Sequence, residues 1–329
     1  MNEGRCIKCG SCMRACPVLN DAAGGRFPGP RTVGVDVPRF PERLSVGSDA
    51  LMCTMCHACE WACPSSITIT LSMARLRAGL ARATTPLPGH QRMMDNIKSF
   101  GHAVRNDFTG WREEGKRTLY FPGCVGLGRL PELTEAASHL LDSLDIGHDI
   151  SSKVRCCGSP LQKIGATEEA DRLRMANIKV FTAYDQVITS CPGCTYQLRE
   201  VYGIRAKHLV ELLPGRELRS TVEGHWALQV PCHLKRGLSP WTAEETISVL
   251  TEAGVDLVRL PEEDSCCGGG GGMLSGFPLT SSSVARSKAK IYRQAGVRGV
   301  ITACPFCSLN LQKEGLLVLD VSQVLTPRD

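Results

Sequence analysis

The sequence predicts two kinds of domain: a small N-terminal α+β module and, after a helical linker, a duplicated α/β domain made of two similar lobes. Three observations predict this. A four-cysteine run occurs twice before residue 80, a five-cysteine pattern occurs twice after residue 118, and short apolar segments alternate with helical periods around the second pattern. The expected boundaries are 1–80, 81–117, 118–215 and 216–329.

The composition narrows the class of protein. A chain of 329 residues with 43% hydrophobic residues can bury a full core, and a net charge of +5 gives no argument for nucleic acid. The 18 cysteines are unusual. Because no apolar signal region follows Met1, they indicate metal-bound thiolates in a reducing, cytoplasmic compartment rather than secreted disulfides. No apolar run reaches the roughly 18 residues of a membrane helix, so we expect membrane association only through a partner.

The N-terminal module carries the run C-x2-C-x2-C-x3-C-P twice with identical spacing. This spacing is typical of bacterial two-cluster ferredoxins, in which the fourth cysteine of each run ligates the other cubane. Zinc also binds Cys-x2-Cys pairs, but it does not explain a duplicated run ending in proline. The predicted ligands are Cys6, Cys9, Cys12 and Cys63 for the first cubane, and Cys53, Cys56, Cys59 and Cys16 for the second.

Other residues of this module are expected to cover the clusters. Residues 24–41 are rich in proline and glycine and have no helical or strand period, so they predict a loop over the clusters or a docking surface. Met52, Met55 and Trp61 are expected to pack around the second cluster, where excluding water would shift its reduction potential. His57 is interpreted as a surface or supporting residue rather than a ligand.

The linker predicts two helices. The first covers residues 67–82 after a Ser65–Ser66 cap and ends before Pro86, and the second covers 91–108. The region is basic, which we interpret as a solvated face, with a docking strip for an acidic partner or anionic lipid as the alternative. The basic residues are Arg75, Arg77, Arg82, Arg92, Lys98, Arg105, Arg112, Lys116 and Arg117.

The duplicated half repeats the order strand, cysteine, helix, paired cysteines with glycine, helix, strand, Cys-x2-Cys, at an offset of roughly 110 residues. Expected strands are 118–121, 186–190, 226–230 and 299–303, and expected helices are 131–144, 167–183, 242–253 and 280–295. Thr167–Glu169 and Ser239–Trp241 resemble helix starts. The cysteines follow the strands, and the carboxyl ends of parallel strands are where open α/β sheets place their sites.

The paired cysteines indicate metal chemistry. Adjacent cysteines form a disulfide only with strain, but they can present two thiolates to one centre. Glycines beside them let the backbone approach, and their N–H groups can donate to cofactor sulfur. One zinc shared by the two Cys-x2-Cys pairs would leave six cysteines unused, while five thiolates per copy exceed a cubane's four. The glycines selected as cofactor-binding are Gly158, Gly268, Gly269 and Gly270.

A nucleotide site is the alternative for the glycines that follow the first strand of the duplicated half. Gly123, Gly126 and Gly128 stand in the wrong order for a dinucleotide fingerprint, and the sequence has no phosphate-binding G-x4-G-K-[ST] loop. We therefore expect neither bound nucleotide nor bound flavin.

These motifs together resemble a known family. Residues 118–329 resemble the duplicated CCG domain of the B-type subunit of heterodisulfide reductase, and residues 1–80 resemble its two-cubane C-type subunit. The fused order resembles the D-type subunit and the iron–sulfur subunits of glycolate oxidase, lactate-utilisation enzymes and anaerobic glycerol-3-phosphate dehydrogenase. The resemblance implies one or two non-cubane [4Fe–4S] clusters besides the two cubanes. Their implied ligands are Cys124, Cys156, Cys157, Cys191 and Cys194 in copy one, and Cys232, Cys266, Cys267, Cys304 and Cys307 in copy two.

The resemblance also implies a function within a complex. Electrons from the cubanes would reach the ten CCG cysteines and reduce a small-molecule heterodisulfide between the lobes, which takes two electrons. His233, with Lys235, is the candidate proton donor or anion holder, although a supporting hydrogen-bond role for His233 is the favoured interpretation. Gly158-Ser159-Pro160 in copy one, against the glycine run of copy two, predicts unequal clusters with copy two more open.

Two other functions stay open. The chain could be an electron-relay subunit of a flavin-linked dehydrogenase that delivers electrons to a quinone or cytochrome, or a zinc-stabilised scaffold without redox chemistry. Because the sequence has no flavin site and no haem-binding motif, the expected partner is a flavoprotein subunit, a membrane cytochrome b or another electron-transfer subunit.

Overall fold

The computed structural model describes residues 5–328. Its N-terminal module places α1 (Ser11–Arg14) and α3 (Ala58–Trp61) inside the two four-cysteine runs, and these two helices contact each other. Four further helical turns lie between them: η2 (Ala22–Gly24), η3 (Thr32–Asp36), α2 (Val37–Arg39) and η4 (Ser48–Met52). The prediction of an irregular loop over residues 24–41 is therefore wrong. The segment coils because Val33 and Val35 are buried, and η3 packs against the first linker helix.

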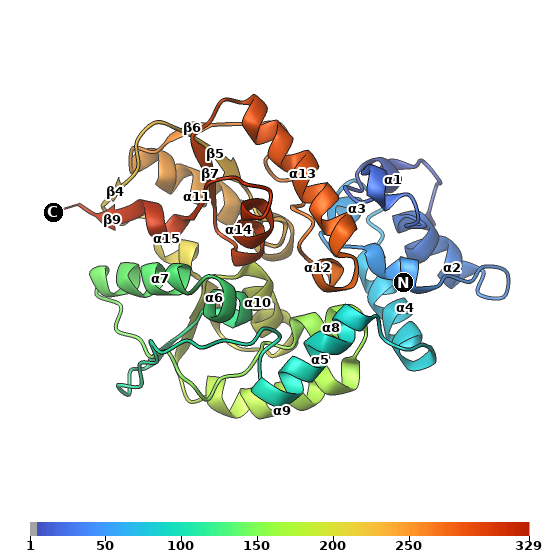
Figure 1. Ribbon diagram of the computed structural model, residues 1–329, viewed down its shortest axis with the longest axis horizontal. Coiled ribbons are helices and arrows are strands. Elements are labelled where there is room, and N and C mark those ends of the chain that lie inside the picture. The colour runs from blue at the N-terminus through green and yellow to red at the C-terminus, as the bar shows by residue number, and fades with distance from the viewer. Residues whose placement is uncertain (1–4, 329) are drawn as a thin grey trace.

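The linker forms α4 (Ile69–Ala83) and α5 (Pro88–Phe100). Thr68 precedes α4 without a side-chain cap, so Ser65–Ser66 is not the cap that the sequence predicted. The second helix ends earlier than expected, because Gly101 takes the left-handed conformation (φ 77°) that terminates helices. The first of these helices, α4, lies beside the N-terminal module, whereas α5 extends away from that module along copy one, where Met93 and Ile97 share a buried cluster with Leu161 (Figure 1).

The duplicated half contains two parallel sheets. In the first, the order β1 (Thr118–Phe121), β2 (Gln186–Thr189), β3 (Ala206–His208) pairs Leu119 with Val187. The second has the order β6-β5-β7-β8. A separate antiparallel pair is formed by β4 and β9, the strands that precede and follow this sheet in the sequence. Their bounds are β4 (Leu218–Ser220), β5 (His225–Gln229), β6 (Asp256–Val258), β7 (Gly299–Thr302), β8 (Val318–Asp320) and β9 (Leu325–Pro327). The four expected strands are confirmed to within a residue.

The four helices expected here are confirmed to within two residues, and the Ser239 side chain caps α11 by accepting a hydrogen bond from the Trp241 backbone N–H. The longer helices are α7 (Pro131–Ser143), α9 (Thr167–Phe181), α11 (Pro240–Glu252) and α13 (Pro278–Gln294). The shorter ones are α6 (Gly123–Arg129), α8 (Ser159–Ile164), α10 (Pro192–Tyr196), η5 (Gln197–Val201), η6 (Leu209–Leu212), η7 (His233–Leu238), α12 (Met273–Gly276), α14 (Pro305–Gln312) and α15 (Val321–Val324).

One hydrophobic core joins the two sheets. It contains Tyr120 and Ile188 from the first sheet and Trp226, Leu228 and Ile301 from the second, all buried. At its rim, the helix after the first predicted strand of each copy meets the helix after the second predicted strand of the other copy: α6 contacts α14, and η7 contacts α10. The carboxyl ends of the strands in both sheets therefore point toward a common region.

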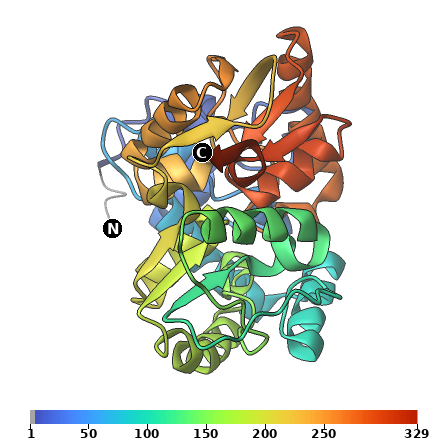
Figure 2. The same cartoon turned by 90° about the vertical axis from the view of Figure 1, so that its left-hand side faces the viewer.

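The N-terminal module packs on the α12–α13 side of the second copy (Figures 1 and 2). Two hydrogen bonds link η2 to α13, from Ser287 to the Asp21 carboxylate and from Thr280 to the Ala23 carbonyl. No helix within residues 5–328 has the length and apolar character needed to cross a bilayer.

Candidate metal centres

The eight N-terminal thiols lie in two groups. Cys12 has Cys6 and Cys63 as charge neighbours, and Cys9 lines the same shallow hollow as these three. The other group is Cys16 with its charge neighbours Cys53, Cys56 and Cys59. In each group the fourth cysteine of one run joins the first three of the other, as the spacing predicted. That each group binds a cubane stays a prediction.

The ten remaining thiols form one chain of contacts per copy, at the carboxyl ends of the strands. In copy one, Cys194 Sγ lies 3.4 Å from Cys157 Sγ. The other neighbouring pairs in that copy are Cys124–Cys156, Cys156–Cys157 and Cys191–Cys194. Copy two repeats the arrangement with Cys232–Cys266, Cys266–Cys267, Cys267–Cys307 and Cys304–Cys307.

Two further sulfur contacts connect the sets. Cys191 of copy one is a hydrogen-bond neighbour of Cys304 of copy two. Cys56 of the N-terminal module is a hydrogen-bond neighbour of Cys266 in copy two. Copy two therefore lies between the N-terminal thiols and copy one, an arrangement that the spacing of the cysteines did not reveal.

Backbone N–H groups point at the sulfur atoms in both copies. Gly268 N–H donates to Cys266 Sγ (3.4 Å), and Gly269 N–H donates to the Cys267 sulfur. Copy one repeats this, with Gly158 N–H directed at the Cys156 sulfur. Such donors stabilise sulfur as a thiolate, the form that ligates iron.

Space and charge around the thiols also fit iron–sulfur ligation. Burial raises the pKa of the Cys16 thiol to about 12, so a thiolate there requires positive charge, which iron would supply. A Cβ at Gly123 would lie 3.1 Å from Cys194 Sγ, so this close approach to the sulfur requires glycine. The buried Tyr202 hydroxyl is a neighbour of Cys157 and of the Asn177 side-chain amide. Because an amide N–H donates to the hydroxyl oxygen, the O–H itself can donate to a bound sulfide.

The zinc alternative needs four thiolates directed at one point. Within the described part of the chain, no three or more Cys, His, Asp or Glu side chains are arranged to hold a single metal ion. The thiolates of a cubane bind different irons and surround the cluster instead. The geometry therefore gives the zinc interpretation no support.

The glycine run of copy two has a second role. A Cβ at Gly271 would lie 2.4 Å from the Cys53 carbonyl oxygen, and one at Gly270 would lie 3.0 Å from the Thr54 carbonyl oxygen. Gly270 thus faces the N-terminal module, and its selection as cofactor-binding stays a prediction. The expectation that copy two is more open stays a prediction, because Gly268–Gly272 and Gly158–Pro160 alike contain only buried and partly buried residues.

Arg77 contradicts the prediction of a solvated basic face, because it is completely buried. Its guanidinium donates to four carbonyls: Leu51 (2.9 Å) and Cys53 (2.7 Å) in the N-terminal module, Lys163 in copy one, and Gly271 (2.8 Å) in copy two. A single cation thus joins three parts of the chain. The other basic residues named for the linker are not buried, so the solvated face holds for the exposed ones such as Arg105.

Two predictions about packing near the second thiol group have different outcomes. Met52 and Met55 are buried in one apolar cluster with Cys16, as expected. Trp61 is 51% exposed, so its predicted packing is wrong. His57 Nδ1–H donates to the Glu60 carboxylate (2.7 Å), consistent with a supporting residue.

His233 lies at the meeting point of three segments. Its Nδ1 is 3.5 Å from Cys232 Sγ, and its Nε2 is 2.9 Å from Lys163 Nζ of copy one. The rings of His57 and Tyr196 lie within about 6 Å of the His233 ring, at 5.8 and 6.2 Å between centroids. Burial and the Lys163 charge keep the pKa of His233 well below its usual range.

The partner of His233 was not foreseen. Lys163 lies on α8, and nothing in its sequence context distinguishes it from a solvated lysine. Lys235, which the sequence singled out, forms an ion pair with Asp264 (2.9 Å), a carboxylate that Arg236 also approaches (3.5 Å). An anion-holding role for Lys235 stays a prediction. Lys288, likewise unpredicted, is buried beside the copy-two thiols and donates to Ser265 Oγ (2.8 Å).

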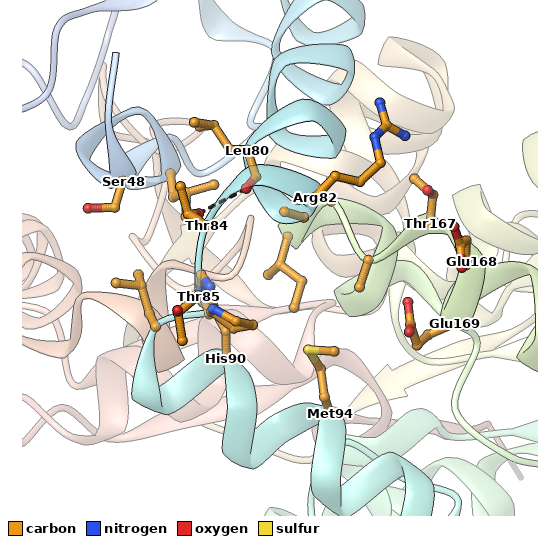
Figure 3. A pocket seen from close by; sticks show the side chains of 17 residues that line it. Ser48, Leu80, Arg82, Thr84, Thr85, His90, Met94, Thr167, Glu168 and Glu169 are labelled. Carbon is orange, nitrogen blue, oxygen red and sulfur yellow. Dashed lines mark hydrogen bonds between the residues drawn. The ribbon is translucent and has the colours of Figure 1, made fainter. Parts of the chain in front are cut away.

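A separate cavity lies between the linker and copy one, and the cysteines of residues 5–328 do not line it (Figure 3). Its wall includes Leu80, Thr84, His90 and Met94 from the linker, with Glu168 at the start of α9. His90 is held by the Gly272 carbonyl (2.9 Å). We assign this cavity no role in the thiol chemistry.

Comparison with protein families gives two matches. The cysteine-rich domain family (CCG) matches residues 118–199 and 226–312, about half of the chain. The 4Fe-4S dicluster domain family matches residues 4–67. The duplication and the two-cluster N-terminal module are therefore both found by family comparison.

Relatives agree with these matches. The chain is 29% identical to the B-type subunit of the CoM/CoB fumarate reductase of Methanothermobacter marburgensis, over 97% of this chain and 70% of that protein. It is 26% identical to the D-type subunit of a dihydromethanophenazine:CoB–CoM heterodisulfide reductase of Methanosarcina acetivorans, over 94% of this chain and 88% of the relative.

An N-terminal match covers 42% of this chain at 30% identity, and 79% of the C-type subunit of a ferredoxin:CoB–CoM heterodisulfide reductase of Methanosarcina mazei. A hypothetical protein from Helicobacter pylori has a similar fold, with a TM-score of 0.61 and 11% identity over 95% of this chain and 70% of that chain. The chain therefore belongs to the CCG-domain family and resembles the D-type subunit of heterodisulfide reductase, since it fuses a C-type dicluster module to a B-type duplicated CCG domain.

Proposed function

We propose that this iron–sulfur subunit reduces a thiol heterodisulfide between its two CCG copies. The observation that carries the proposal is the contact of Cys191 with Cys304, where the thiol sets of the two copies meet. A disulfide takes up two electrons and two protons and gives two thiols. Two cluster sites that meet at one point could each deliver one of the two electrons.

The cofactors in this proposal are two cubane and two non-cubane [4Fe–4S] clusters, held by the thiol groups described above. When bound, such clusters accept and release single electrons at potentials set by their surroundings. The contact of Cys56 with Cys266 makes copy two the entrance from the N-terminal module. Cys191 then links copy two to copy one through Cys304.

Side chains beside this meeting point would bind and orient the substrate. Lys163 Nζ forms no ion pair within residues 5–328, and it lies beside both His233 and the Cys191–Cys194 turn, 4.0 Å from a Cβ at Gly193. Its ammonium group would hold an anionic substituent of the disulfide. His233 hydrogen-bonds both Lys163 and Cys232, so it would fix the position of the ammonium group.

An electron-relay role is the second candidate, and burial favours it. Cys191 and Cys304 are only 4% and 7% exposed, so a substrate would reach them only if the copies separate. In a relay the chain would pass electrons between a flavoprotein subunit and a cytochrome or quinone, without breaking a bond. Under either candidate function, the expected partners of this chain are electron-transfer subunits.

The test compares the two candidates in anaerobically reconstituted protein. Four clusters require about sixteen iron atoms per chain, since each holds four. Dithionite-reduced protein given the CoB–CoM heterodisulfide, the compound named for the relatives, should release free thiols, and Lys163→Met should raise the KM more than it lowers kcat. Normal iron content and reduction without thiol release would reject the disulfide proposal and favour the relay.

A further inference from the structure

The N-terminal thiol group at the far end of the chain of contacts is the least covered of the four. Cys9 is exposed and Cys6, Cys12 and Cys63 are partly exposed, whereas every thiol of the other groups is buried or partly buried. Electrons that enter or leave the protein at its surface would therefore cross here, because the remaining groups lie behind protein.

A large apolar side chain stands beside this exposed sulfur. Ile7 is 67% exposed, although it lies between two of the predicted ligands. It shares one shallow hollow with Cys6, Cys9 and Lys8. Lys8 (φ 56°) and Gly10 (φ 79°) take left-handed conformations around Cys9, so the turn has a fixed shape. An exposed apolar residue on a rigid turn is typical of the centre of a protein–protein contact.

Three basic residues lie near Ile7 in the sequence. Arg5, Lys8 and Arg14 are exposed, and none of them forms an ion pair with another residue of the described range. Arg14 is fixed at the thiol, since its guanidinium donates to the Cys9 carbonyl (3.2 Å) and to Ser11 Oγ (3.2 Å). Nearby carboxylates of the described range are already engaged: Asp21 accepts from Ser287 Oγ (3.0 Å), Asp36 pairs with Arg31, and Glu60 pairs with His57.

We propose that Arg5, Ile7, Lys8 and Arg14, here called the Ile7 patch, form the docking surface for an acidic electron-carrier protein. Ile7 would pack at the centre of the contact, while the three cations attract an acidic rim on the carrier and steer it to Cys9. The inference rests on the proposed electron-transfer function and adds to it the chemistry of the partner. It also moves the expected docking strip from the linker to the N-terminal turn.

Charge reversal tests the surface. In holo-protein, stopped-flow mixing with a reduced, small acidic ferredoxin measures the second-order rate of electron transfer. Arg5→Glu with Lys8→Glu should lower this rate at least about tenfold at low ionic strength, because electrostatic steering changes association rates by that order. The deficit should shrink toward zero in 0.5–1 M salt, where charges are screened over roughly 3–4 Å. Electron transfer from the dithionite-reduced protein to an oxidised, basic c-type cytochrome should not slow.

A matched pair keeps the test specific. Lys179→Glu with Lys290→Glu makes the same change of net charge at two exposed lysines on α9 and α13, and should leave the rate within about twofold because these charges lie outside the contact. Ile7→Ser should slow transfer about equally at low and high salt, since it removes apolar contact rather than charge. Equal slowing by the two charge-reversed pairs, or no slowing by either, would overturn the proposal.

The same experiment separates this inference from the proposed function. Iron content and the dithionite-reduced electron paramagnetic resonance spectrum should match wild type in all variants, because Arg14 and the cysteines are unchanged. If wild-type protein itself shows no iron–sulfur signals, the proposed function fails. If the signals are normal and the Ile7 patch variants still accept electrons at the wild-type rate, only the docking surface is rejected.

Discussion

The two CCG copies have the same thiol pattern but different neighbours. On α9 of copy one, the Asn177 amide donates to the Cys156 carbonyl (2.8 Å). At the same position on α13 of copy two stands Lys288, which donates to Ser265 Oγ (2.8 Å) and to the Glu262 carbonyl. Both side chains are buried, and both hold the segment that leads into the paired cysteines. One copy is braced by a neutral amide and the other by an ammonium group.

The coverings differ as well. Copy two is covered by the N-terminal module, since Arg236 donates to the Cys56 carbonyl (2.9 Å) and Arg77 to the Gly271 carbonyl. Copy one is covered by the linker, where the Gly101 carbonyl accepts from Cys156 N–H (2.8 Å) and His102 lies 3.7 Å from Cys124 Sγ. The duplication kept the thiols, and divergence gave copy two the buried cations. Because buried positive charge stabilises added negative charge, we expect copy two to hold electrons more tightly.

The largest effect is expected at Arg77, which joins both copies to the N-terminal module. Arg77→Met leaves four buried carbonyls without their donor, so the free energy of unfolding should fall by about 4 kcal/mol or more, or roughly 10 °C in the midpoint of thermal unfolding. Arg77→Lys should recover only part of the loss, because an ammonium group lacks the planar fork. A loss below about 1 kcal/mol would show that the carbonyls find other partners.

Asp320 and His208 distinguish the copies at the ends of equivalent strands, where each begins a short helix with a capping box. Burial raises the pKa of Asp320 to about 6. A folded-state pKa above the unfolded value favours folding in the protonated form, and that contribution is lost as the pH rises through 6. Asp320→Asn should therefore stabilise the protein by up to about 3 kcal/mol at pH 7.5 and by about half of that at pH 5.

Thermal unfolding at the two pH values measures this difference. His208, at the equivalent position of copy one, is the comparison. Burial lowers its pKa, so its imidazole is neutral at both pH 7.5 and pH 8.5. His208→Gln should change stability by the same amount at pH 7.5 and pH 8.5. An Asp320→Asn gain that does not depend on pH would mean that folding does not raise the pKa of this carboxyl group.

The contact of copy two with the N-terminal module is tested at Gly271. Gly271 (φ 66°) and Gly203 (φ 68°) have the same backbone conformation, but a Cβ at Gly203 meets nothing within 4 Å, whereas one at Gly271 lies 2.4 Å from the Cys53 carbonyl oxygen. Alanine at either position should cost about 1 kcal/mol of conformational strain, and Gly271→Ala about 1–3 kcal/mol more from the clash. Equal melting temperatures for the two variants would contradict the tight contact.

The smallest effect is expected from the charge difference itself. Lys288→Met should lower the midpoint potential of the copy-two centre by on the order of 60 mV, a tenfold change in a one-electron equilibrium, and should leave the copy-one centre unchanged. Potentiometric titration followed by electron paramagnetic resonance measures both centres in one sample. Lys288→Arg keeps the charge and should keep the potential. A shift of equal size in both centres would remove the proposed asymmetry between the copies.

The sequence alone determined the elements and the pattern of the thiols. Strand and helix positions in the duplicated half follow from short apolar segments and helical periods, which are local properties, and Ser239 marks the start of α11 because side-chain capping is local too. The crossed grouping of Cys16 and Cys63 followed from the spacing, since a run this short cannot reach round a cluster by itself.

Only the tertiary structure decided which groups meet. Arg77 has the local sequence of a solvated helical arginine, and its burial depends on carbonyls 24 to 194 residues away. Gly270 and Gly271 suit a cofactor loop equally well until the N-terminal module is packed on them. The links from Cys56 to Cys266 and from Cys191 to Cys304, like the pairing of Lys163 with His233, join segments whose proximity is set by the shared core. Periodicity and spacing describe a segment's own preferences, whereas contacts between distant segments depend on how all the buried surfaces fit together.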